Sequence, residues 1–330
     1  NKDFNNFSGK IKKFNTNFFI GNLLNEKFNF FKTRLNIQLN GSYNIKTKKD
    51  FSIQSVNFVS NESILNFKNI EGKKNLKTGF SGLFSWDKNK NILEFYDLIL
   101  GKQLTAFGEI DLKSQNGTSN FSIQKILVKD FKNYLNKFLI NYDFPVEVNF
   151  NKILHRFRGG NLKNLNLNVK FSLFKKFVIE EITGSSLLSN TRFDYDDKIF
   201  KKLLSTISGD FDFKLKPHKL DDSLFNVNLN ATNGFLLVNN YIKYKFSKAK
   251  FIGKFYNNNL LISKADFFKN SDLEYTFNDI KISKDTLYIE KAMHIKERKV
   301  KYIINNTTIN DMKVTKSTLK IKNNEELSNY

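Results

Sequence analysis

Strict alternation of apolar and polar residues in the stretch "NLKNLNLNVKFSLF" (161–174) constrains the fold more than any other feature. Leu165, Leu167, Val169, Phe171 and Leu173 occupy every second position, and asparagine, lysine and serine fill the gaps. Successive side chains of a β-strand point to opposite sides, so this pattern predicts a strand with one apolar and one polar face. A fold built from such strands has to cover its apolar faces with something.

Several alternating runs begin with a short motif of five residues, apolar-x-Gly-x-apolar, in which x is any residue. It occurs as "FSGKI" (7–11), "LNGSY" (39–43), "FSGLF" (80–84), "AFGEI" (106–110), "ISGDF" (207–211) and "FIGKF" (251–255). The runs 82–100 and 253–268 each predict a hairpin, and Asn116-Gly117 predicts a tight turn. A glycine inside a strand marks a bulge, a bend or a close backbone approach, so its recurrence predicts a sheet that coils. The irregular spacing of the motif excludes a solenoid of fixed period.

The whole chain reads as mainly β, with about twenty candidate strands and only 2 prolines among 330 residues. We expect residues 1–330 to form a single elongated segment, a coiled antiparallel sheet with an apolar groove. The chain begins at Asn1 without methionine, so we expect it to be a fragment of a longer protein. Apolar residues at helical spacing predict two short capping helices, at about 127–145 and about 196–207.

The formal net charge of +22 suggests phosphate binding, but its distribution does not favour nucleic acid. Only five of the 54 basic residues are arginine, the side chain that best recognises phosphates and base edges. The lysines are spread along the chain, and asparagine is equally abundant. We therefore expect no nucleic-acid partner, and attribute the charge to a solvated face or to a surface near anionic head groups.

No constellation of residues predicts an enzyme, a cofactor or a metal site. The sequence has no cysteine, and His155, His218 and His294 lack metal-ligand spacing. The acidic stretch "DYDD" (194–197) lacks the glycine and the final glutamate of a calcium loop. Asp210 and Asp212 lie opposite Phe211 and Phe213 in an ordinary amphipathic strand, so we expect them to be solvated rather than to act as acid and base.

The apolar face itself is the candidate site. Around the glycine motifs, the residues expected to line it are Leu35, Ile37, Leu39, Phe80, Phe84, Trp86, Leu165, Leu167, Val169, Phe171, Phe211, Phe213, Phe225, Val227, Leu229, Phe251 and Phe255. Burying such side chains fully is worth about 1.5–3 kcal/mol each, so they will not stay in water. Two sheets could close on each other as a sandwich, or the sheet could curl into a trough occupied by acyl chains.

The hairpins "LNGSYNI", "FSGLFSW", "AFGEIDL" and "FIGKFYN", together with "RGGNLKNLNLNVKF", resemble the C-terminal region of AsmA-like proteins. These belong with the TamB-type and other bridge-like lipid-transfer proteins of the bacterial envelope. The resemblance covers about residues 7–320 and is one of overall pattern. It implies a β-groove with an apolar interior in the periplasm, held at the inner membrane by an N-terminal helix that this sequence lacks.

The role implied by the resemblance is non-enzymatic. It is movement of phospholipid or another acyl-chain lipid between inner and outer membranes, or outer-membrane assembly and maintenance, with envelope partner proteins unknown. Two alternatives remain open at this point: an outer-membrane β-barrel, whose strands also alternate, and a ligand-free structural surface protein.

Overall fold

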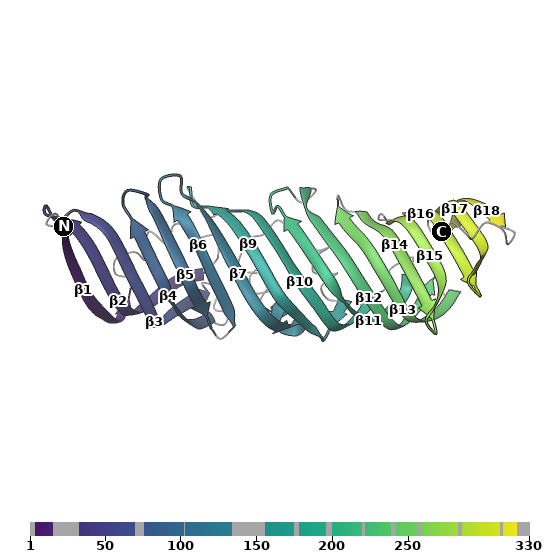
Figure 1. The fold of residues 1–330 in the computed structure, drawn as a ribbon, viewed down its shortest axis with the longest axis horizontal. Coiled ribbons are helices and arrows are strands. Elements are labelled where there is room, and N and C mark those ends of the chain that lie inside the picture. Colours follow the sequence, from purple (N-terminus) through teal and green to yellow (C-terminus); the bar gives the residue numbers. More distant parts are fainter. Residues whose placement is uncertain are drawn as a thin grey trace. The chain divides into compact units, whose positions relative to one another are not determined.

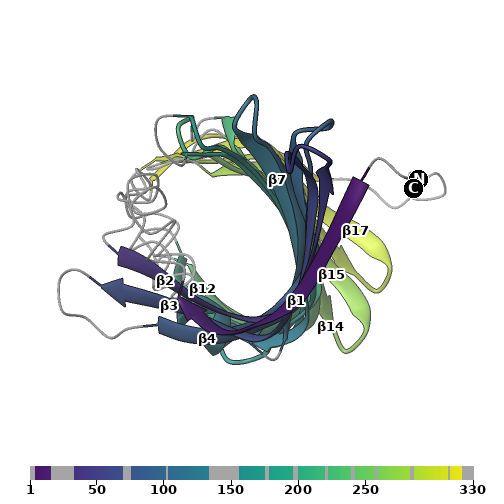
Figure 2. The same ribbon diagram turned by 90° about the vertical axis from the view of Figure 1, so that its left-hand side faces the viewer.

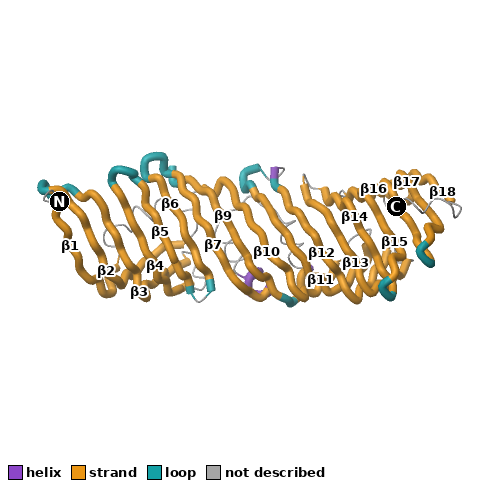
Figure 3. The backbone as a smooth tube through the Cα atoms, in the orientation of Figure 1, coloured by secondary structure: helices purple, strands orange, loops and turns teal. Residues whose placement is uncertain are grey.

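The structure is a computed structural model, and nearly all of the residues that it describes lie in β-strands (Figure 3). The described ranges are 4–15, 33–69, 76–101, 103–133, 156–174, 178–195, 200–219, 222–238, 242–256, 259–282, 286–310 and 313–321. The described strands belong to one antiparallel sheet, in which most strands pair with their neighbours in the sequence (Figure 1). The expected mainly β fold is therefore confirmed.

The strands of the first part of the chain are β1 (Phe4–Asn15), β2 (Thr33–Lys48), β3 (Ile53–Asn69), β4 (Leu76–Asp87), β5 (Ile92–Leu100), β6 (Leu104–Asp111), β7 (Asn116–Leu127), β8 (Phe157–Arg158) and β9 (Asn161–Ser172). Those of the second part are β10 (Val178–Tyr195), β11 (Phe200–Leu215), β12 (Leu224–Val238), β13 (Ile242–Tyr256), β14 (Asn259–Lys269), β15 (Asp272–Ile282), β16 (Thr286–Lys296), β17 (Lys299–Asn310) and β18 (Lys313–Ile321).

The chain divides into two compact units. Unit 1 comprises Asn1–Lys125, Asn133–Pro145 and Asn164–Gly184, and unit 2 comprises Ile126–Lys132, Val146–Lys163 and Ser185–Tyr330. In unit 1 each strand from β1 to β6 pairs antiparallel with the next, and in unit 2 the same holds from β11 to β18. The expectation of a single segment over 1–330 stays a prediction.

The hairpins predicted at 82–100 and 253–268 are confirmed as β4–β5 and β13–β14, but the turn predicted at Asn116-Gly117 is wrong. The turn lies earlier, at residues 112–115, where Asp111 Oδ1 accepts the backbone N–H of Lys113 at 2.8 Å. Asparagine and aspartate stabilise turns in this way. Gly117 belongs to β7, where the Phe171 ring leaves no room for a side chain.

One short helix is described, at residues 128–133, within the helix predicted for 127–145. Its Lys132 Nζ donates to the backbone oxygen of Phe157 at 2.9 Å, and the backbone N–H of Val128 donates to Gly160 at 3.1 Å. Residues 134–155, which include the rest of that prediction, lie outside the described residues.

The second helix, predicted at about 196–207, is wrong, because β11 begins at Phe200. The backbone of Leu203 pairs with Leu236, and that of Leu204 pairs with Phe235. The register with β12 shifts at Phe200/Lys202 and again at Leu204/Thr206. These irregularities break the two-residue period and leave apolar residues at helix-like spacing, while pairing with β12 overrides local propensity.

Residues with left-handed backbone recur inside the strands and mark where the sheet bends. In unit 1 they include Lys13 (φ 51°), Glu62 (φ 55°) and Asp97 (φ 48°), each beside a register shift. The β1 and β3 shifts begin on one line of paired residues, Ile11, Gly41, Ser60 and Gly82. A bulge bends its strand, so a row of bulges curves the sheet, and Figure 2 shows β1 to β4 as arcs.

Candidate functional site

All seven candidate residues of unit 2 share one face of the sheet, which we call apolar face 2. The register pairs Phe211 with Val227, Phe213 with Phe225, Leu229 with Phe251, and Phe225 with Phe255. Directly paired residues of an antiparallel ladder lie on the same face, and alternation along each strand places the remaining members there.

The rings on apolar face 2 contact one another in two groups. The ring centroids of Phe213 and Phe225 lie 5.5 Å apart, and those of Phe225 and Phe255 lie 6.5 Å apart. Phe251 contacts Phe267 at 5.5 Å, and Phe267 contacts Phe277 at 5.8 Å. Sequence reasoning missed Phe267 and Phe277. The register shift at Ile252/Gly253 leaves Ser263 as an extra residue, which breaks the alternation of β14 just before Phe267.

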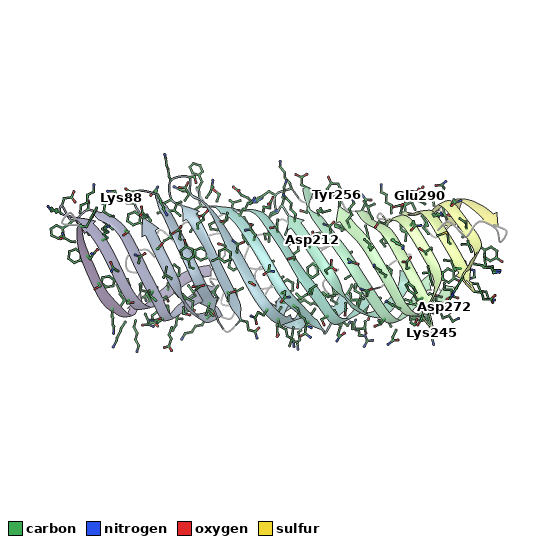
Figure 4. All side chains as sticks on the ribbon, in the orientation of Figure 1. Lys88, Asp212, Lys245, Tyr256, Asp272 and Glu290 are labelled. Carbon is green, nitrogen blue, oxygen red and sulfur yellow. The ribbon has the colours of Figure 1, made fainter. Side chains whose placement is uncertain are left out.

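The opposite face of unit 2 is polar. Asn226 Nδ2 donates to Asp212 Oδ1 at 2.8 Å, and Asn228 Nδ2 donates to Asp210 Oδ1 at 3.2 Å. On β14, Asp266 accepts the Thr276 hydroxyl at 2.6 Å. Asp212, labelled in Figure 4, belongs to this face. The two carboxylates of "GDFDF" are thus each held by an asparagine amide of the neighbouring strand.

In unit 1, Ile37, Leu39, Phe80, Phe84 and Trp86 also share one face, which we call apolar face 1. The register pairs Phe58 with Phe84, Val56 with Trp86, Ile37 with Leu65 and Ser63 with Phe80. β3 carries the extra residue of its bulge, so β2 and β4 alternate without interruption. Leu35 pairs through its backbone with Phe67, and its side chain lies outside the described residues.

The opening stretch, now β9, places its leucines on the same side. Ser122 Oγ donates to Asn166 Oδ1 at 2.9 Å, and Asn168 Nδ2 donates to Asn120 Oδ1 at 2.7 Å. These bonds join the polar faces of β7 and β9, so the alternate residues, Leu165, Leu167, Val169 and Phe171, face the other way. The Phe171 ring lies over Gly117 of β7. A row of directly paired residues, Gly117, Ile110, Leu93 and Trp86, connects this position with Trp86. Phe171 therefore lies on apolar face 1.

The glycine motif has a packing explanation, because its glycines lie beneath rings or backbone of the adjacent strand on the apolar faces. A Cβ on Gly108 would lie 2.6 Å from Phe95 Cζ, and one on Gly9 would meet the Tyr43 ring. All five alanines of the chain, Ala106, Ala231, Ala249, Ala265 and Ala292, are also buried, at 9% exposure or less. Small residues let side chains converge on the inside of a bend.

The apolar faces are the more sheltered sides of each unit. Phe80 is only 6% exposed, whereas Leu83, its neighbour on the opposite face of β4, is 37% exposed. In unit 2, Phe251 is half-buried, and the adjacent Ile252 is exposed. The described strands all belong to one sheet, so the described part of the chain has no second sheet to pack on either apolar face.

The described residues contain no group of three or more histidine, cysteine, aspartate or glutamate side chains that could hold a metal ion. In the same part of the chain, no helix has the length and hydropathy needed to cross a membrane. What the described geometry offers is therefore two apolar surfaces.

Comparison of the chain with protein-family models, with curated proteins and with solved structures found no match.

Proposed function

We propose that this chain is a non-enzymatic lipid-binding segment whose apolar faces hold the acyl chains of phospholipid. By its resemblance to AsmA-like proteins, we further propose that it serves phospholipid transport or outer-membrane maintenance in the periplasm. The observation that carries the proposal is that the candidate residues gather on one apolar face in each unit, and that the described strands all belong to one sheet.

The energetics favour an occupant. Extended apolar surface is normally covered by a partner, a ligand or a membrane, and a row of half-buried phenylalanines such as Phe211, Phe213 and Phe225 is such a surface. Burying one methylene contributes about 0.8 kcal/mol, so ten methylenes of an acyl chain would contribute about 8 kcal/mol before ordering costs. A flexible chain also fits an irregular floor of rings and alanines, because it needs no fixed hydrogen-bonding partner.

The alternation of β13 supplies a matched pair of variants for the test. Phe251→Asp places a charge on apolar face 2, and Ile252→Asp places the same charge one residue away on the polar face. We expect protein purified from a bacterial host without detergent to carry phospholipid, detected by native mass spectrometry and lipid extraction. Phe251→Asp should lose most of this lipid, and Ile252→Asp should retain it.

Circular dichroism checks whether each variant folds. If Phe251→Asp does not fold, Phe84→Asp and Leu83→Asp repeat the comparison on β4 of unit 1. Lipid-free, monodisperse wild-type protein, or equal loss of lipid from both members of a pair, would refute the proposal.

A further inference from the structure

The two long edges of apolar face 2 differ in chemistry. One edge is a line of six directly paired residues without a polar side-chain atom: Phe213, Phe225, Phe255, Leu260, Ile282 and Leu287. We call it the phenylalanine edge. Tyr256, at this end of β13, is labelled in Figure 4.

The opposite edge carries rings with polar atoms, and we call it the tyrosine edge. Its members are Tyr244 of β13, Tyr275 of β15, His294 of β16 and Tyr302 of β17. The backbone of His294 pairs with both Tyr275 and Tyr302. The His294 ring stacks on Tyr275 at 4.8 Å and lies parallel to Tyr302 at 6.0 Å. Tyr244 meets Tyr275 edge-on at 5.1 Å.

Polar and charged groups lie next to the rings of the tyrosine edge. The Tyr244 hydroxyl donates to Glu274 Oε2 at 2.7 Å, and burial together with this carboxylate keeps the pKa of the Tyr244 phenol well above its usual value. The adjacent β16–β17 turn exposes Lys296, Arg298 and Lys299 against one acid, Glu297. Lys245 and Asp272 mark this edge in Figure 4.

The turn at the phenylalanine edge between β11 and β12 is different, because its Lys216 is paired with Asp222 at 3.4 Å. Excess positive charge beside polar rings therefore distinguishes the tyrosine edge. Tyrosine favours boundaries between hydrocarbon and water, since its ring is apolar and its hydroxyl needs a polar partner.

We infer that unit 2 binds phospholipid in one orientation, with the phosphate head group at the tyrosine edge and the acyl chains running across to the phenylalanine edge. This inference rests on the proposed function and adds a direction to it. The distance suits the ligand. Leu287 on the phenylalanine edge and His294 on the tyrosine edge are seven residues apart on β16 (294 − 287), which is about 23 Å at about 3.3 Å per residue. One phospholipid spans half of a hydrocarbon core of about 30 Å plus its glycerol group, which is a comparable length.

Two photoreactive probes test the orientation in the intact chain. One is phosphatidylethanolamine with a diazirine on its head group, and the other carries the diazirine at the end of an acyl chain. After illumination, peptide mass spectrometry locates the cross-links. We expect the head-group probe to prefer the tyrosine edge by about fivefold, the ratio given by one net hydrogen bond of about 1 kcal/mol. The acyl-end probe should prefer the phenylalanine edge.

A double variant, Tyr275→Phe with Tyr302→Phe, keeps both rings and removes their hydroxyls. We expect its head-group preference to fall toward unity while total cross-linking persists. Tyr256→Phe removes an exposed hydroxyl from the polar face and should leave the preference unchanged.

The outcomes separate the two claims. Cross-linking to apolar face 2 without an edge preference, or with the reverse preference, would overturn the orientation and leave lipid binding intact. The absence of cross-links from both probes would overturn the orientation and the proposed function together.

Discussion

Glycine and alanine leave the room that rings and backbone of neighbouring strands occupy on the apolar faces. At Gly108, an added Cβ would meet the Phe95 ring and the backbone of β7, whereas at Gly79 the nearest atom is Ser63 O at 3.8 Å. Both glycines lie inside strands of unit 1. They therefore form a pair in which Gly108 lies in a filled place on apolar face 1 and Gly79 lies in an open place on the opposite face.

We predict that Gly108→Ala destabilises the protein by about 1–3 kcal/mol, the usual cost of overpacking. Gly79→Ala should change stability little or raise it by up to about 1 kcal/mol, because alanine lowers the entropy of the unfolded chain. Urea unfolding followed by circular dichroism measures both. Equal effects of the two substitutions would contradict the packing explanation of the glycine motif.

Alternation predicted which residues share a face of the sheet, but not how the two edges of apolar face 2 differ. Phe211, Phe213 and Phe225 could be assigned because their strands are regular on both sides of each residue. The tyrosine edge was missed, because the register that brings Tyr275, His294 and Tyr302 together depends on pairing between strands. No local sequence signal contains that pairing.

Among the elements, the bulges are what sequence reasoning could foresee least. Asparagine tolerates left-handed backbone, so Asn233 and Asn306 had a recognisable signal, whereas Glu62 and Lys13 had none. The second predicted helix failed for the same reason, since the irregular pairing of β11 imitates helical spacing. The number and direction of the strands depend on alternation and turns, and were much easier to predict.

The bulge of β3 leads to a prediction about stability. Glu62 has φ 55°, a conformation that costs an ordinary residue about 1–2 kcal/mol and glycine nothing. We expect Glu62→Gly to stabilise the protein by about 0.5–1 kcal/mol, because relief of strain exceeds the added chain entropy. Asn57→Gly, in the regular part of β3, should destabilise it by about 0.5–1 kcal/mol. Thermal unfolding measures both, and destabilisation by Glu62→Gly would show that its side chain, not its backbone, matters.

For the whole molecule, the consequential feature is that the described strands of both units belong to one antiparallel sheet. Each unit has one apolar and one polar face, so this arrangement of faces occurs twice along the chain. The sequence predicted this alternation of faces. It left open whether two sheets close on each other, because that depends on contacts between layers, which periodicity does not encode.

The single tryptophan provides a direct test of whether acyl chains occupy an apolar face. Trp86 lies on apolar face 1, paired with Val56 and Leu93, so its fluorescence reports on that face alone. Bromine atoms attached to an acyl chain quench tryptophan only at short range. We predict that phospholipid with brominated acyl chains quenches Trp86 strongly, and that unbrominated lipid does not.

The control moves the reporter to the opposite face of the same strand, by combining Trp86→Phe with Leu83→Trp. We predict that brominated lipid quenches tryptophan at position 86 several-fold more than tryptophan at position 83. Equal quenching at the two positions, or no quenching at position 86, would mean that acyl chains do not occupy the apolar face.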